Sequence, residues 1–323
     1  MPPVVRKLLL ASPRGYCAGV ERAVETVERA LELYGAPVYV RKQIVHNLHV
    51  VRELEQRGAI FVEEETEVPE GKTIVFSAHG VAPAVREQSE LRRLRAIDAT
   101  CPLVTKVHVQ ARRYAADGYT VILVGHDGHE EVVGTMGEAP GKIVLVESSE
   151  DVDRLTFPTG TKLAYVTQTT LSVDETGEVI TALRRRFPDI HAPRKEDICY
   201  ATSNRQWAVK EMLGEIDLLL VIGSHNSSNS NRLVEVARSG GVSSYLIDDE
   251  SEIDEAWLDG VEVVGVTSGA SAPEKLVQRV CAWFEARGEV EIVAHRLVTE
   301  DVEFRLPVEL RRELRLAAAQ TAV

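Results

Sequence analysis

The sequence has no apolar run long enough to cross a membrane and no segment typical of a secretion or transit peptide. Its longest apolar runs, such as residues 218–222, have the length of a strand, far below the ~18 residues that a membrane helix needs. The first residues, M-P-P-V-V-R-K-L-L-L, lead directly into A-S-P-R-G without a cleavage pattern. We therefore expect a cytoplasmic protein with no membrane partner.

Basic residues are also few relative to acidic ones: the chain has 37 Lys and Arg but 50 Asp and Glu, which gives a net charge of −13. A field of this sign repels polyanions, so nucleic acid is not an expected partner. With 44% hydrophobic and 27% charged residues, the composition is that of an ordinary globular protein. At 323 residues the chain is long enough to bury a sizeable core.

Cysteines are few, and their spacing is informative. Four cysteines without a C-x-x-C pair do not form a disulfide framework in a reducing compartment. Cys17, Cys101 and Cys199 each precede an amphipathic stretch whose apolar positions recur three and four residues apart, which predicts a helix after each cysteine. Cys281 instead lies on the apolar side of a predicted helix, which favours core packing.

A repeated unit follows each of the three cysteines. After the helix come a short β-branched run and a polar loop, then a second and a third such run, and a second polar loop. The first loop holds its polar residues 28 or 29 positions after the cysteine in all three copies. The residues of these loops that we single out are His46, His79, His129, Glu131, Thr169, Ser227, Ser228, Asn229 and Ser271.

This order of elements predicts an α/β fold of three lobes, each a small parallel sheet with flanking helices. Because ligands bind beyond the carboxyl ends of parallel strands, where all these loops lie, we expect a pseudo-threefold body with a central cavity. We place the lobes at residues 1–100, 101–196 and 197–283. Residues 284–323 are predicted to be a C-terminal tail with one extra strand at residues 302–306.

Three thiolates at helix N-termini are soft, electron-rich ligands that favour zinc or an iron–sulfur cluster. Because a fully ligated 4Fe-4S cluster takes four cysteines, three would leave one iron open to a substrate. Free cysteines are also common core residues, so the spacing alone leaves a purely structural role open. The threefold correspondence of Cys17, Cys101 and Cys199 favours ligation.

The loop residues are mostly neutral hydrogen-bond donors without a matching cluster of Lys. Such a set suits a multivalent oxyanion, such as a phosphate or diphosphate, held in a closed pocket. Glu131 is the one acid that we single out, since a lone carboxyl group among hydroxyls and imidazoles can act as a general acid. The alternative for Glu131 is a solvated loop residue beside Glu130.

Eight segments of the sequence resemble one known family, the 4-hydroxy-3-methylbut-2-enyl diphosphate reductases, which catalyse the last step of the methylerythritol phosphate route to isoprenoids. In chain order these segments are P-R-G-Y-C-A-G-V-E-R-A, V-H-N, F-S-A-H-G-V, D-A-T-C-P-L-V-T-K-V-H, T-Q-T-T-L-S, D-I-C-Y-A-T-S-N-R-Q, N-S-S-N-S-N-R-L and S-G-A-S-A-P. The resemblance runs from about residue 7 to residue 310.

The resemblance implies reductive dehydroxylation to isopentenyl and dimethylallyl diphosphate, with a 4Fe-4S cluster on Cys17, Cys101 and Cys199 in the central cavity. It implies a reduced ferredoxin or flavodoxin as electron donor, and Glu131 with Thr169 as the proton-delivery pair. The residues implied to hold the substrate diphosphate are His46, His79, His129, Ser227, Ser228, Asn229 and Ser271. One departure is Glu130, which stands where many members carry Pro and which could compete with Glu131.

Two other classes of protein fit part of the pattern. A zinc protein could use the three cysteines and one His as a closed structural site. An enzyme with a cysteine nucleophile and a nearby His as base would use one thiol and leave the other two unexplained.

Overall fold

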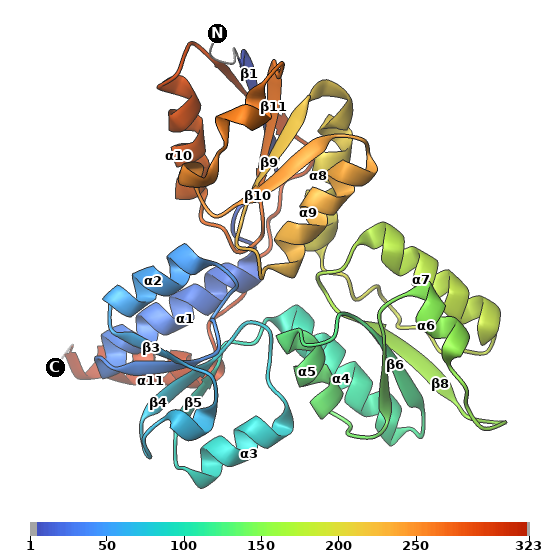
Figure 1. Cartoon of the computed structure of the whole chain (residues 1–323). Coiled ribbons are helices and arrows are strands. Elements are labelled where there is room, and N and C mark those ends of the chain that lie inside the picture. Colours follow the sequence, from blue (N-terminus) through green and yellow to red (C-terminus); the bar gives the residue numbers. More distant parts are fainter. Residues whose placement is uncertain (1–4, 322–323) are drawn as a thin grey trace. The chain divides into compact units, whose positions relative to one another are not determined.

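The computed structural model describes residues 5–321, and its strands form three separate parallel sheets flanked by helices (Figure 1). The strand orders are β10-β9-β11-β1-β12, β3-β2-β4-β5 and β7-β6-β8, and every paired strand runs parallel to its neighbour. The predicted α/β class with three small parallel sheets is therefore confirmed.

The strands are β1 (Lys7–Ser12), β2 (Val38–Arg41), β3 (Ala59–Val62), β4 (Thr73–Phe76), β5 (Arg95–Asp98), β6 (Thr120–Val124), β7 (Ile143–Val146), β8 (Leu163–Thr167), β9 (Leu218–Ile222), β10 (Ser243–Ile247), β11 (Val263–Ser268) and β12 (Glu291–Arg296). The helices are α1 (Ala18–Tyr34), α2 (Leu48–Gln56), α3 (Pro83–Leu91), α4 (Pro102–Ala116), α5 (Glu130–Gly137), α6 (Ser149–Arg154), α7 (Val173–Arg186), α8 (Tyr200–Met212), α9 (Ser228–Ser239), α10 (Glu274–Glu285) and α11 (Val308–Thr321).

The chain forms two compact units, which are described separately. Unit 1 comprises the described residues up to Ala18, His46–Val50 and Cys199–Glu303. Unit 2 comprises Gly19–Val45, Val51–Ile198 and the described residues from Phe304 onward. The predicted lobe boundaries near residues 100 and 196 remain a prediction.

Unit 1 is a five-stranded sheet with helices on both faces. Alternate residues of a strand point to opposite faces, so Leu8 and Leu10 of β1 join the core under α10, whereas Leu9 and Ala11 join the core under α8 and α9. Cys281 of α10 lies in the first of these cores, 9% exposed, which confirms the packing role predicted for it.

Two strands of this sheet were not predicted, and one predicted strand is absent. Strand β1 pairs with β11 and β12, so residues 7–12 belong to the five-stranded sheet. The extra strand is β12, while residues 302–306 lie outside any strand and helix α11 follows them. The prediction of a strand at 302–306 was wrong because a short alternation of apolar and charged residues carries no information about a pairing partner.

Unit 2 holds the other two sheets. In the four-stranded sheet, Ile74 and Phe76 of β4 form a core together with Val81 and Leu94. In the three-stranded sheet, α4 and α5 cover one face and α6 and α7 cover the other (Figure 1). Helix α11 contacts α1 through a hydrogen bond in which the Tyr34 hydroxyl donates to Glu313 Oε2 at 2.7 Å.

The three predicted helices and the nine strands of the repeat are confirmed as α1, α4, α8, β2, β3, β4, β6, β7, β8, β9, β10 and β11. Pro102 is the first residue of α4, and Gly35, just beyond α1, has a φ of +71°, a conformation that ends helices and favours glycine. Within residues 5–321, none of the helices is both long and apolar enough to span a bilayer.

Candidate functional site

Each of the three repeat cysteines stands at the start of a helix, as predicted. Cys101 is the N-cap residue of α4, Cys199 is the N-cap residue of α8, and Cys17 directly precedes α1. All three are partly exposed, and none of the four cysteines, which all lie within the described residues, forms a disulfide. The positive end of a helix dipole stabilises a thiolate at this position.

Main-chain contacts fix the cysteine positions within each unit. In unit 1 the Cys17 N–H donates to the Ala270 carbonyl at 3.2 Å. The Thr202 N–H donates to Cys199 Sγ at 3.4 Å, so the sulfur itself caps the helix. Burial raises the pKa of Tyr200, and the charges of Cys17 and Cys199 add to that shift. In unit 2 the Cys101 N–H donates to the Ala78 carbonyl at 2.9 Å.

The polar loops of unit 1 follow β9 and β11, and they meet the segment that contains His46. Ser271 Oγ donates to the His46 carbonyl at 2.8 Å, and the Asn226 side chain lies 3.3 Å from His46 Nδ1. Ser227 is the N-cap residue of α9 and accepts the Ser230 N–H at 3.3 Å. The structure therefore brings the predicted residues His46 and Ser271 into contact within unit 1.

Asn229 is the most informative residue of this group. It lies in the first turn of α9, after Ser228, the first residue of the helix, and is only 5% exposed. Neither its amide nitrogen nor its amide oxygen has a hydrogen-bond partner among the described residues. A buried amide without partners costs about 1–3 kcal/mol, and a bound polar ligand would remove that cost.

Glu131 and Thr169 of unit 2 are in direct contact. Thr169 N–H donates to Glu131 Oε1 at 2.7 Å, and Thr169 Oγ1 donates to Oε2 at 2.9 Å. Burial raises the pKa of Glu131 to about 7, although the two hydrogen bonds from Thr169 act in the opposite direction. A carboxyl group with such a pKa carries a proton in about half of the molecules at neutral pH, as a general acid requires.

The neighbouring acid, Glu130, faces a different partner. Its carboxylate lies 3.2 Å from His79 Nδ1 and accepts a hydrogen bond from Ser77 Oγ at 3.5 Å. The rings of His79 and His129 lie edge to face with centroids 5.8 Å apart, and burial lowers the pKa of His79 to about 4. The two adjacent glutamates thus contact different partners.

Sequence reasoning did not single out two polar residues that organise these loops. Gln168 accepts the His126 N–H at 3.1 Å and donates to Thr170 Oγ1 at 2.9 Å, which joins the loops after β6 and β8. Asn226 contacts His46, as described above. Both stand directly beside a residue that was singled out, so their position in the repeat was the available signal.

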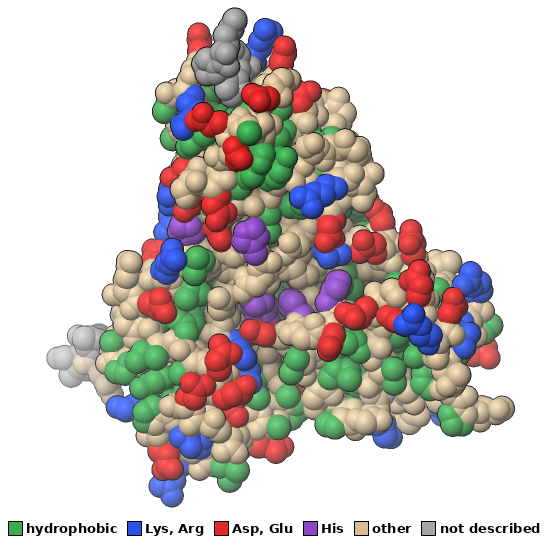
Figure 2. Space-filling view, in the orientation of Figure 1, with side chains coloured by type: hydrophobic (Ala, Val, Ile, Leu, Met, Phe, Trp, Pro, Cys, Tyr) green, Lys and Arg blue, Asp and Glu red, His purple; other side chains and the backbone are tan. Residues whose placement is uncertain are grey.

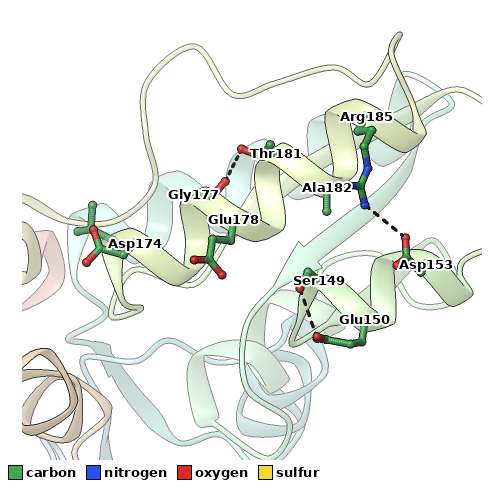
Figure 3. A pocket seen from close by; sticks show the side chains of 10 residues that line it. Ser149, Glu150, Asp153, Asp174, Gly177, Glu178, Thr181, Ala182 and Arg185 are labelled. Carbon is green, nitrogen blue, oxygen red and sulfur yellow. Dashed lines mark hydrogen bonds and ion pairs between the residues drawn. The ribbon is translucent and has the colours of Figure 1, made fainter. Parts of the chain in front are cut away.

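Charged side chains and a groove are further features of the surface. Acidic and basic side chains are interspersed over the visible face rather than gathered by sign (Figure 2). A groove of about 690 Å³ lies between α6 and α7, with Glu150, Asp153 and Arg185 in its wall (Figure 3). No predicted site residue lines it.

The chain is similar to known proteins over almost its whole length. The sequence profile of a family described as LytB protein matches residues 8–285. A protein of Acidothermus cellulolyticus named 4-hydroxy-3-methylbut-2-enyl diphosphate reductase is 61% identical, covering 97% of this chain and 93% of that protein. A protein of Streptomyces coelicolor with the same name is 58% identical, with the same shares covered.

A solved structure is also similar to this chain over almost its whole length. The E-1-hydroxy-2-methyl-but-2-enyl-4-diphosphate reductase from Plasmodium falciparum matches with a TM-score of 0.94 and 39% sequence identity. The match covers 97% of this chain and 99% of that one. With the family profile covering most of the sequence, and full-length relatives well above half identical, the chain belongs to the LytB protein family.

Proposed function

We propose that the chain is a reductase that removes the hydroxyl group of 4-hydroxy-3-methylbut-2-enyl diphosphate and releases isopentenyl diphosphate and dimethylallyl diphosphate. Membership of the LytB family and the names of the relatives support this substrate. The single observation in the structure that carries the proposal is Glu131, a buried acid held on both oxygens by Thr169 with a pKa near 7.

The reaction consumes two electrons and two protons for each substrate molecule. The allylic C–O bond breaks, a C–H bond forms, and the oxygen leaves as water. Electrons alone would expel hydroxide, which is a poor leaving group, so one of the two protons must reach the departing oxygen.

The cysteines fit the electron carrier that this chemistry needs. Cys17, Cys101 and Cys199 would hold a 4Fe-4S cluster, because three thiols that stand at helix N-termini and form no disulfide supply soft, anionic ligands. The bound cluster supplies the electrons one at a time and, with three cysteines, has one iron that no cysteine occupies. The place of Cys281 in the core of unit 1 argues against this role for it.

The substrate diphosphate would be held by neutral donors and helix N-termini. Asn229 offers a buried amide that lacks a partner among residues 5–321, and Ser227 and Ser228 stand at the start of α9, where N–H groups favour anions. The other donors that we assign to the diphosphate are His46, His79, His129 and Ser271. Such a set binds an oxyanion without a Lys cluster.

Glu131 would deliver the proton to the departing oxygen through Thr169. The Glu131 carboxyl group passes its proton to Thr169 Oγ1, 2.9 Å away, and the same hydroxyl releases its own proton to the substrate oxygen. The hydrogen bond from the Thr169 N–H to Glu131 Oε1 keeps the carboxyl group in place during this transfer. Because Glu131 and Thr169 are both buried, bulk water does not protonate them directly.

The electrons would come from a reduced ferredoxin or flavodoxin in the cytoplasm. A reducing compartment keeps the three partly exposed thiols available as ligands, since oxidation would consume them.

Anaerobic purification followed by iron and acid-labile sulfide assays tests the proposal. We expect a brown protein with about four iron and four sulfide per chain, which reduces the substrate when a chemically reduced viologen supplies electrons. A colourless protein with one zinc would contradict the proposal and would support a structural zinc site instead.

A further inference from the structure

The largest fully buried side chain among the described residues is a cation, Arg205 of α8. Its Nη1 donates to the Ala201 carbonyl at 2.9 Å and to the two carboxylate oxygens of Glu300 at 3.1 and 3.3 Å. Its Nη2 donates to the Gly15 carbonyl at 2.8 Å. Burying a guanidinium group is costly, and only such a set of acceptors offsets the cost.

Glu300 lies in a segment without regular structure that follows β12. Its side chain is 13% exposed and also accepts a hydrogen bond from Asn204 Nδ2 at 3.0 Å. The apolar neighbours Leu297, Val298 and Val302 are all exposed. Glu300 is therefore a principal anchor of this segment on α8.

Gly15 lies two residues before Cys17, in the loop that leaves β1. Its N–H donates to Ser268 Oγ at 2.8 Å, and its carbonyl accepts from Arg205, so the peptide is held from both sides. The φ of Gly15 is +73°, a conformation that other residues rarely adopt. Arg205 is also six residues after Cys199 on α8, so one side chain connects the supports of both cysteines.

We infer that the Arg205–Glu300 ion pair positions the Cys17 and Cys199 thiolates for the iron–sulfur cluster and keeps the buried charge on α8 balanced. This inference rests on the proposed function. Neither residue touches substrate or reacting atoms in this account, so both are positioning residues. Positioning of the thiolates depends on the Arg205 guanidinium, which contacts Glu300 through Nη1 and Gly15 through Nη2. Charge balance depends on the negative charge of Glu300.

A purely structural ion pair makes different predictions from a positioning pair. A buried pair often contributes little net stability, and breaking it lowers stability without changing a redox centre elsewhere. If the pair balances charge beside the cluster, removal of the Glu300 charge leaves a buried cation that stabilises the more negative, reduced state. The reduction potential then becomes more positive.

Two conservative variants separate the two parts. Glu300→Gln keeps the shape and an acceptor for Arg205 and Asn204 but removes the charge. Arg205→Lys keeps the charge but cannot reach both Glu300 and Gly15 with a rigid fork. Glu65→Gln is the matched control, because Arg41 and Glu65 form an ion pair at 3.0 Å with side chains 14% and 9% exposed, at the end of β2 in unit 2.

The variants are reconstituted anaerobically, after circular dichroism confirms that each apoprotein is folded. The rate of iron release to a chelator and the midpoint potential of the cluster are then measured. We expect both Glu300→Gln and Arg205→Lys to release iron at least tenfold faster than wild type. We expect a more positive potential in Glu300→Gln, little change of potential in Arg205→Lys, and wild-type values in Glu65→Gln.

Wild-type iron release and potential in Glu300→Gln would overturn the inference, and so would equal iron loss in Glu65→Gln. If Arg205→Lys does not fold, Glu300→Gln alone decides, since its amide oxygen can still accept from both Arg205 and Asn204. A wild-type protein that binds no cluster would instead refute the proposed function, so the two failures are distinguishable.

Discussion

Replacement of Glu131 by Gln separates proton delivery from binding. The amide has nearly the shape of the carboxyl group, its oxygen can accept the Thr169 N–H, and its nitrogen can donate to Thr169 Oγ1. It has no acidic proton to donate. We therefore expect the cluster and substrate affinity to be retained, and kcat to fall by about 100-fold to 10,000-fold, as for the loss of a general acid.

The raised pKa of Glu131 makes turnover and stability depend on pH in a defined direction. Because the protonated form donates, wild-type turnover should fall as the pH rises through about 7. The folded protein holds this proton more tightly than the unfolded chain, so its stabilising effect is complete below pH 4.5 and is lost as the pH approaches 7. The full loss is roughly 3 kcal/mol, from 1.36 kcal/mol for each unit of pKa.

Glu131→Gln removes this pH-dependent loss. At pH 8 the variant apoprotein should therefore unfold at a higher temperature than the wild-type apoprotein, with a much smaller difference at pH 5. Thermal unfolding at both pH values and steady-state turnover from pH 6 to 9 are the measurements. Near-normal turnover in Glu131→Gln beside an inactive Glu130→Gln would refute the reasoning, since it would assign the acid to the other glutamate.

Three further predictions concern the other residues of the site. Single Cys17→Ser, Cys101→Ser and Cys199→Ser replacements should each lower the iron content, whereas Cys281→Ser should keep both iron and activity because its thiol packs in the core of unit 1. Asn229→Ala and His46→Ala should weaken diphosphate binding, measured by calorimetry, by about tenfold or more while the cluster spectrum stays unchanged, as expected for the loss of one hydrogen bond to a charged group. Glu130→Gln should raise KM more than it lowers kcat, because its carboxylate contacts His79 rather than Thr169.

The repeat made most of the fold predictable from sequence. The spacing of apolar and polar residues predicts a helix after each cysteine and a polar loop after each strand. These elements depend on neighbouring residues in the chain, so the sequence alone is enough to predict them. The pairing of β1 with β11 does not follow from such patterns, because Lys7 and Val263 are far apart in sequence. A buried strand does not indicate by its own residues which other strand it pairs with. The same applies to β12, whose alternation is weak because most of its residues are exposed.

The contacts among the residues singled out from sequence were not predictable. Sequence position singled out Glu131 and Thr169, and only the structure shows that they share two hydrogen bonds. Glu130 stands next to Glu131 in the chain, yet its partner His79 follows a strand of another sheet. Arg205 gave no sequence signal as a buried residue, since an Arg in a helix of mixed composition is usually exposed.

The interior place of β1 in its sheet, between β11 and β12, sets an order of events during synthesis. Lys7 must wait for Val263 before the strand finds its neighbour, and at the 5–20 residues per second typical of translation this delay is roughly 13–50 s. Until then the apolar run Leu8–Ala11 has no sheet to join, which exposes it to chaperones and to other nascent chains. The loop that carries Cys17 is likewise incomplete until Ser268 and Ala270 have emerged, so the proposed cluster would be acquired by a nearly finished chain.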